Sequence, residues 1–264
     1  MTPTRTRRGV ALMLVLWLVV LLATVGAAVA LHARGATNVA VNVRARAAAR
    51  YAAESGVEAA VAELEAQLAA RPDTLARRTY LNAIDRALAT TDAQPLGDAR
   101  FQVALVDASA RLDLNLAGED ALAALFAQVG APDGGRGAAR AVQAWLGAEG
   151  ARDGVGATAG VAGVARRRQF RSLDDLARVP GVSPALARAA APHLTVDGDG
   201  RVNVAGASAA VRAAARGETV REPTRLLVVS RGWRDGSPLT HEIQAVYAVR
   251  GDRLAFVRWR ERDL

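Results

Sequence analysis

The chain of 264 residues contains no cysteine and no lysine. Without cysteine it cannot form disulfides, iron–sulfur clusters or cysteine-rich zinc sites, and thiolate catalysis is excluded. Without lysine it has neither a Schiff-base nucleophile nor the lysine of a phosphate-binding P-loop. All 34 basic residues are therefore arginine. The formal net charge of +8 suggests anionic partners such as lipid headgroups or nucleic acid, although an arginine- and alanine-rich composition accounts for it equally well.

Residues that carry catalysis are also scarce. The three histidines, His32, His193 and His241, belong to no metalloprotease motif, because His241-Glu242 lacks a second histidine at the required spacing. No Gly-x-Ser-x-Gly nucleophile elbow occurs. The glycines of 154–160 have the wrong spacing for a dinucleotide fingerprint, and no predicted strand precedes them. The sequence therefore predicts that the chain is not an enzyme.

The most prominent feature that is present is a long apolar run near the N-terminus. It covers 22 residues from Val10 to Leu31, broken only by Thr24 and Gly26. A helix that spans a membrane needs about 20 residues. Three arginines precede the run, whereas one histidine and one arginine follow it closely. By the positive-inside rule we expect the N-terminus in the cytoplasm and the rest of the chain outside.

A cleaved secretory signal peptide is the alternative to a retained anchor. Such a peptide also begins with basic residues, and Ala28-Val29-Ala30 has the small residues of a cleavage site. Its apolar core, however, is only about 7–15 residues long. In this chain a helical pattern continues past the run, with no proline before Pro72. The pattern favours one helix that runs through the membrane into the folded part.

This continued helix carries an apolar stripe that is expected to dock on a folded body. Val57, Val61, Leu64 and Leu68 follow one another at steps of four, three and four residues. The segments 225–230, 241–249 and 253–260 are rich in β-forming residues, and the tight turn 250–252 joins the last two. They predict a three-stranded meander that packs against the helix.

The start of the chain resembles a type IV prepilin leader. Arg7-Arg8-Gly9 is followed directly by the apolar helix from Val10, as in a short basic peptide that ends in glycine. The resemblance implies cleavage by prepilin peptidase after Gly9 and N-methylation of the new first residue, Val10. It also implies that the helix stays in the membrane after cleavage.

One anchor position departs from the pattern of most such subunits. They carry glutamate at the fifth residue of the mature chain, and this chain has Leu14 there. In that family the carboxylate is taken to neutralise the terminal ammonium of an assembled neighbour in a low dielectric. The minor pseudopilin K family characteristically lacks this glutamate, and a subunit at the tip has no neighbour ahead of it. The alternative is that Leu14 is one more apolar anchor residue.

The middle of the chain mixes strands and helices. The segments 101–106 and 111–115 predict two strands joined as a hairpin. Helices are expected over 119–129 and 136–147, separated by the breaker Pro132-Asp133-Gly134-Gly135. The segment 147–163 is rich in glycine and alanine and is expected to form a loop.

The segment 170–186 predicts a helix-hairpin-helix. Ser172 suits an N-cap with Asp175 completing the capping box, Pro180-Gly181 ends the first helix, and Pro184 begins the second. Such a module either braces a fold or holds DNA phosphates on the amides of its turn. Its expected core and turn residues are Leu173, Leu176, Val179, Pro180, Gly181, Val182 and Leu186.

Two related units flank this helical part. In 111–117 and 201–206 a short strand ending in Asn-x-Ala precedes a helix, with Asn115 and Asn203 as the matching residues. Beside the second unit, Asp197, Asp199 and Asn203 place hard oxygen ligands at alternate positions, as calcium loops do. Members of the K family bind calcium, but their ligands cannot be mapped residue by residue onto this loop. A solvated turn is the alternative.

Nearly the whole chain, most clearly 7–31 and 170–206, resembles the minor pseudopilin K family of type II secretion systems. The resemblance implies an α+β fold, in which a pilin-like α/β domain with an antiparallel sheet carries an inserted all-helical domain. Relatives usually have a Trp-Arg-Asp-type sequence where this chain has Trp145-Leu146-Gly147, and threonine in place of Leu116 and Val204. The implied divisions are the leader 1–9, anchor 10–31, stalk 32–70, pilin-like parts 71–117 and 196–264, and helical insert 118–195.

The resemblance also implies a function. It predicts a single-pass inner-membrane protein whose periplasmic body caps the pseudopilus tip with the minor pseudopilins I and J and initiates its assembly, for export of folded proteins across the outer membrane. Prepilin peptidase, the inner-membrane assembly platform, and an exoprotein or the secretin are the further partners that it implies. Calcium is the one candidate cofactor. A minor pilin of a type IV pilus is the nearest alternative.

A membrane-anchored DNA receptor of the competence type is a rival from a different class. It also joins one anchor to a helix-hairpin-helix and a basic surface. DNA-binding hairpins usually carry a second glycine so that amides can approach phosphate, and Gly181-Val182-Ser183 lacks it. The long stalk and the C-terminal strands have no place in such a receptor. The sequence therefore disfavours nucleic acid as a partner.

Overall fold

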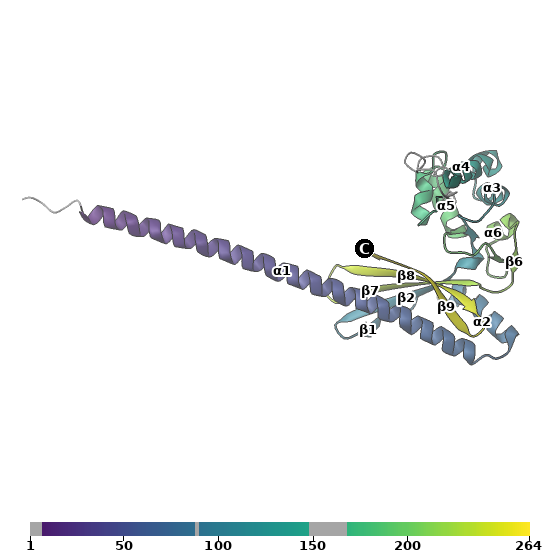
Figure 1. Cartoon of the computed structure of the whole chain (residues 1–264), viewed down its shortest axis with the longest axis horizontal. Coiled ribbons are helices and arrows are strands. Elements are labelled where there is room, and N and C mark those ends of the chain that lie inside the picture. Colours follow the sequence, from purple (N-terminus) through teal and green to yellow (C-terminus); the bar gives the residue numbers. More distant parts are fainter. Residues whose placement is uncertain (1–6, 88–89, 148–167) are drawn as a thin grey trace, which may run out of the picture.

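The computed structural model describes residues 7–87, 90–147 and 168–264, without the side chains of 7–11, 30–38 and 85–87. The predicted leader up to residue 6 and the predicted loop beyond Gly147 lie outside the described residues. One α-helix of 63 residues, α1 (Arg7–Ala69), opens the described chain. Its N-terminal half projects away from the folded body, and its C-terminal half lies along a sheet (Figure 1). The fold is α+β, as predicted.

The sheet has five antiparallel strands in the order β1-β2-β7-β8-β9. The predicted C-terminal meander is confirmed, since β8 pairs with both β7 and β9. Gly251 has a φ of +66° in the tight turn between β8 and β9, a conformation that glycine adopts without strain. The strands are β1 (Gln94–Leu96), β2 (Ala99–Asp107), β7 (Arg225–Arg234), β8 (Thr240–Arg250) and β9 (Arg253–Asp263).

The C-terminal half of α1 covers one face of this sheet. The predicted stripe is confirmed: Val57, Leu64 and Leu68 are buried, and Val61 is partly buried against the same core. The short helix α2 (Thr74–Ala87) adds Leu81 and Ile84 to it. The strands contribute inward-facing residues at alternate positions, as a half-buried sheet requires; these are Val103, Leu105, Leu226, Val228, Ile243 and Ala245.

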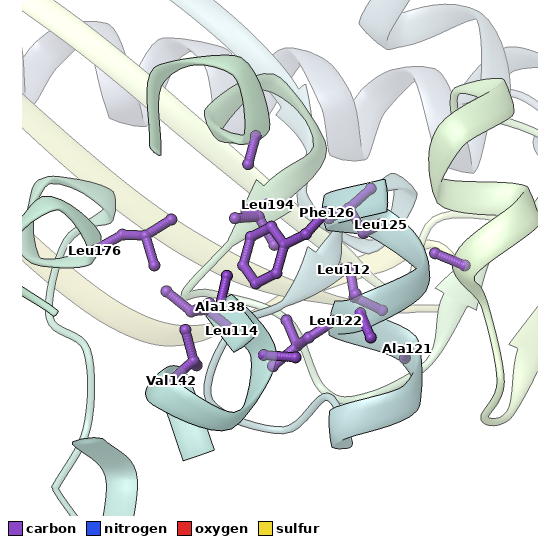
Figure 2. Close-up of a cluster of buried hydrophobic side chains, with 14 of the residues drawn as sticks. Leu112, Leu114, Ala121, Leu122, Leu125, Phe126, Ala138, Val142, Leu176 and Leu194 are labelled. Atoms are coloured by element: carbon purple, nitrogen blue, oxygen red, sulfur yellow. The ribbon is translucent and has the colours of Figure 1, made fainter. Parts of the chain in front are cut away.

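A second core lies in the long segment that connects the neighbouring strands β2 and β7. Asp107 at the end of β2 pairs with Leu226 near the start of β7, so the chain leaves and re-enters the sheet at one place. The described residues of this stretch, 108–147 and 168–224, pack around buried Phe126 and Phe170. Figure 2 shows Phe126 among its neighbours in this core. We call this stretch the insert, and it is wider than the predicted 118–195.

The described elements of the insert are, in chain order, η1 (Ala108–Ala110), β3 (Leu112–Asp113), α3 (Glu119–Gln128), η2 (Pro132–Gly135), α4 (Arg136–Gly147), η4 (Leu173–Arg178), α5 (Pro184–Ala190), η5 (Ala191–His193), β4 (Leu194–Thr195), β5 (Val202–Asn203), α6 (Ala209–Ala214) and β6 (Thr219–Val220).

The predicted hairpin between 101–106 and 111–115 is wrong. Asp107 accepts hydrogen bonds from the N–H groups of Ser109 (2.9 Å) and Ala110 (3.1 Å), which turns the chain into a 3-10 helix at the end of β2. The partner of β2 at this edge is β7, and β3 pairs in parallel with β4 instead. The polar turn after β2 therefore starts the insert and does not return the chain to the sheet.

The two related units are present as two parallel strand pairs, β3 with β4 and β5 with β6. In each unit the residue that ends the first strand accepts an N–H two residues later. Asp113 accepts from Asn115 at 2.7 Å, and Asn203 accepts from Ala205 at 3.2 Å. The structural counterpart of Asn203 is therefore Asp113 and not Asn115, because Asp113 and Asn203 are the two residues whose side-chain oxygen closes the turn after the strand.

Candidate functional site

The N-terminal half of α1 has the properties of a single-pass membrane anchor. The window Leu12–Val29 has a mean hydropathy of 2.7, and none of its residues is buried in the body. Its one hydroxyl is satisfied within the helix, because Thr24 Oγ1 donates to the carbonyl of Leu21 at 2.8 Å. A helix with this length, composition and internal hydrogen bonding fits a lipid environment. The rest of the described chain forms the folded body outside it.

The residues of the predicted leader site lie at the start of this anchor. Gly9 and Val10 are within α1, and their side chains fall outside the described part. Leu14 lies one turn further on with its side chain 66% exposed. It offers neither a charge nor a hydrogen-bond acceptor to a neighbouring helix. Cleavage after Gly9, methylation of Val10 and the tip role of Leu14 stay predictions.

The predicted helix-hairpin-helix is present with a shorter first helix than expected. Its first element is the 3-10 helix η4, and α5 is its second. The carboxylate of Asp175 accepts from the N–H of Ser172 at 3.2 Å, which closes the predicted capping box. Leu176, Val179 and Val182 are buried in the core of the insert, and Leu173 and Leu186 are partly buried against it. Pro180 is exposed. The module therefore braces the insert.

Two amides at the turn of this module are already bonded within it. Gly181 has a φ of +95°, and a Cβ there would lie 3.5 Å from the side chain of Ala141 on α4. The N–H of Val182 donates to the carbonyl of Val179 at 3.1 Å, and the N–H of Leu186 donates to Ser183 Oγ at 3.1 Å. These amides are bonded within the hairpin, so they are not available to DNA.

We predict that duplex DNA does not bind specifically at this turn. The change Gly181→Glu is expected to leave any DNA affinity of the full chain unchanged, because the turn contributes no contact. Fluorescence anisotropy over a series of salt concentrations measures this, since phosphate contacts give affinity that falls steeply with salt. Micromolar binding that Gly181→Glu abolishes would support the DNA-receptor rival.

The three candidate calcium ligands have separate partners. Asp199 pairs with Arg201 at 2.6 Å and accepts from the hydroxyl of Thr224 at 3.2 Å. The amide nitrogen of Asn203 donates to the carboxylate of Asp107 at 2.7 Å. Asp197 is held by two arginines of β9. Within the described ranges no group of three or more His, Cys, Asp or Glu side chains is arranged to hold a metal. Calcium stays a prediction.

Two buried carboxylates and four arginines form a network that the sequence did not predict. We call it the arginine–carboxylate ladder, and it lies on the sheet face turned away from α1. Glu242 pairs with Arg231 and Arg262, each at 2.7 Å, and Asp197 pairs with Arg258 and with Arg260, the latter at 2.6 Å. Gln244 joins the two halves, because it donates to Glu242 at 2.8 Å and accepts from Arg260 at 3.0 Å.

The ladder ties the insert to the sheet. The side chains of Asp197 and Glu242 are only 3% and 1% exposed. Burial alone would raise the pKa of Glu242, but hydrogen bonds from Arg231 and Gln244 outweigh it and hold that pKa below its usual value. Since Asp197 belongs to the insert and its arginines to β9, the pair fixes one unit on the other. The alternation of Arg258, Arg260 and Arg262 was the one signal in the sequence.

No family model matches the sequence, and no curated protein matches it. Among solved structures, the chain is similar to a chain in the crystal structure of the GspK-GspI-GspJ complex from the type 2 secretion system of enterotoxigenic Escherichia coli. The two share 11% identity with a TM-score of 0.47, over 76% of this chain and 96% of that chain.

Proposed function

We propose that this chain is a minor pseudopilin of a type II secretion system, which caps the tip of the pseudopilus and initiates its assembly for export of folded proteins. The observation that supports it is α1. One uninterrupted helix carries an exposed apolar span in its N-terminal half and packs on an antiparallel sheet with the other half. A filament subunit needs this arrangement, because the helix can leave the bilayer for a helical filament core while the body stays folded.

The membrane and the orientation belong to the same proposal. The arginines before the span support an N-terminus in the cytoplasm and a body in the periplasm, with the inner membrane as the anchoring membrane. Prepilin peptidase then acts on Gly9 from the cytoplasmic side, and the inner-membrane assembly platform receives the processed helix. The role is structural, and no catalytic step is assigned to the body.

A place at the tip is supported by two features. Leu14 cannot neutralise the terminal ammonium of a neighbour, so the chain lacks the group that an interior subunit supplies. The described part of the insert, 108–147 and 168–224, lies across the sheet from α1, where it enlarges the body beyond a helix packed on a sheet (Figure 1). At the tip of a filament no further subunit lies above the body, so the insert can be accommodated there. In that position it can face the exoprotein or the secretin.

Co-purification tests the proposal. We expect the full chain, tagged at its C-terminus and extracted from its own membranes in mild detergent, to elute with the minor pseudopilins I and J. A tagged single-pass protein without a pilin-like body is the control for non-specific association. Elution with type IV pilus subunits would instead support the minor-pilin alternative, and elution without any pilin-like subunit would contradict both.

A further inference from the structure

The insert and the helix-covered sheet have separate hydrophobic cores. The core around Phe126 is built by residues of the insert, and the other core is built by residues of α1, α2 and the sheet. No buried apolar residue of the described chain belongs to both cores. Two bodies within one chain are expected to move relative to each other unless a large apolar interface joins them. Other contacts must therefore hold the insert in its place.

The chain passes between the two bodies at one place. Asp107, the last residue of β2, is paired with Leu226 in β7, so the two crossings at 107–108 and 224–225 lie side by side. Two neighbouring crossings can act as a hinge, because torsion changes in a few backbone residues turn everything beyond them as a unit.

Several polar contacts between the bodies lie close to these crossings. The side-chain amide of Asn203 in the insert donates to the carboxylate of Asp107 at 2.7 Å. From α2, the side-chain amide of Asn82 donates to the carbonyl of Arg221 at 2.8 Å. Contacts so near a hinge move little when the insert turns, so they are compatible with rotation about the crossings.

A cleft of about 690 Å³ separates the bodies beyond the crossings. Its lining extends from Val106 and Leu227, which are next to the crossings, to Asp197 and Arg260 of the ladder. The apolar side chains at its inner end face this space and belong to neither hydrophobic core. The two bodies therefore face each other across the cleft and meet again at the ladder.

Asp197 of the insert makes the contact at the ladder end of the cleft. It pairs with Arg258 and, at 2.6 Å, with Arg260, and both arginines belong to β9. Each arginine also donates to a backbone carbonyl of the insert, at 2.9 and 2.7 Å. Asp113, a further carboxylate of the insert, attracts Arg258 electrostatically. We call the ion pairs of Asp197 with Arg258 and Arg260 the latch.

Ion pairs suit a contact that opens and closes. The attraction within a buried ion pair is largely offset by the cost of removing both charges from water, so its net contribution to stability is small. The loss of one partner is nevertheless strongly unfavourable, because the other charge stays buried without compensation. Without Asp197, Arg258 and Arg260 would regain water if the insert moved away from the sheet.

We propose that the insert turns as a rigid body about the crossings at 107–108 and 224–225, which opens and closes the cleft, and that the latch holds it closed. The structure shows the closed position. A minor open population is expected in the unchanged chain, and loss of the latch shifts the equilibrium toward it. This inference goes beyond the proposed function and does not depend on it, because it concerns two parts of the body alone.

Distances between two spin labels measure the opening. The chain has no cysteine, so Leu96→Cys on β1 and Ala189→Cys on α5, both at exposed positions, can each carry a nitroxide label. Double electron–electron resonance on the full chain in detergent gives the distribution of distances between the labels. We expect one dominant distance without further changes. Asp197→Asn is expected to add a second distance and to raise the ratio of open to closed molecules about tenfold or more.

Two further variants separate the latch from a general loosening of the sheet. Arg258→Gln weakens the latch from the sheet side and leaves the residues of the insert unchanged, so it should act in the same direction as Asp197→Asn. Glu242→Gln is the matched control, because Glu242 is equally buried in the ladder but pairs with Arg231 of β7 and Arg262 of β9. It is expected to leave the distance distribution unchanged.

Hydrogen exchange of α3 and α4, which pack in the core of the insert, tests whether the insert moves as a rigid body. We expect their protection to be the same in all variants.

Three results would overturn the proposal. The first is an unchanged distance distribution in both latch variants, and the second is an equal change in Glu242→Gln. The third is loss of protection in α3 and α4 when the latch is weakened, because the insert would then unfold where it is expected to turn. None of these results bears on co-purification with pseudopilins, so failure here and failure of the proposed function are distinguishable.

Discussion

Replacing Gly232 with alanine is expected to lower the free energy of unfolding by about 3 kcal/mol, because α1 and β7 are in backbone contact there. A Cβ on Gly232 would lie 2.2 Å from the carbonyl oxygen of Ala49 and 2.4 Å from the nitrogen of Ala53. These are helix backbone atoms, which cannot rotate aside, so α1 would have to lift from the sheet. Urea unfolding of the full chain in detergent, followed by tryptophan fluorescence, measures the change.

Gly137→Ala is the matched control for this prediction. Gly137 lies in the first turn of α4, and a Cβ there would meet no described heavy atom within 4 Å. Alanine is the better helix former, so the free energy of unfolding should stay the same or rise by up to about 1 kcal/mol. If the two substitutions had equal effects, the close seating of α1 at Gly232 would be wrong.

The second large effect is expected at Leu14. The change Leu14→Glu should strongly reduce secretion of a reporter exoprotein in cells that carry this variant alone. In a tip subunit the new carboxylate has no terminal ammonium of a preceding neighbour to pair with. An unpaired charged side chain in the membrane costs roughly 3 kcal/mol on translocon scales. Insertion or initiation should therefore fail, whereas the apolar change Leu14→Ile should leave secretion unchanged.

The opposite outcome at Leu14 would be informative about the tip. If Leu14→Glu cells secreted normally and the variant were distributed along the filament, the missing carboxylate would be an incidental feature of an ordinary subunit. Localisation by immunogold labelling of sheared filaments, together with the secretion assay, separates these outcomes. The tip assignment would then have to be withdrawn, although the anchor and the pilin-like body would stand.

Elements that depend on local periodicity could be predicted from the sequence. The stripe through Val57, Leu64 and Leu68 needs only helical spacing, and the turn at Gly251 needs only a short glycine-containing connection. Pairings between distant segments could not be predicted. The sequence places Asp107 and Leu226 more than a hundred residues apart, and nothing in their neighbourhoods shows that they are opposite each other in the sheet. Nearby strands were expected to pair, which produced the wrong hairpin.

The ladder shows the same limit for the site. Arg258, Arg260 and Arg262 alternate, which places them on one face of a strand. The partners of these arginines depend on strand register and on how the insert packs. Glu242 of β8 lies opposite Arg262 of β9, and Asp197 belongs to the insert, which has its own core. For Asp197 the acidic spacing indicated a calcium loop, although its carboxylate faces two arginines. A pattern of ligand types cannot show which counter-charge lies nearby.

If α1 is a processed and retained pilin-type anchor, the mass of the mature N-terminus will show it. The chain should be purified from membranes and its N-terminal peptide analysed by mass spectrometry. The expected result is a chain that begins at Val10 with a methylated amine, and a chain with a bulky residue in place of Gly9 should keep its leader. A mature chain that begins at Leu31, after Ala28-Val29-Ala30, would contradict the account.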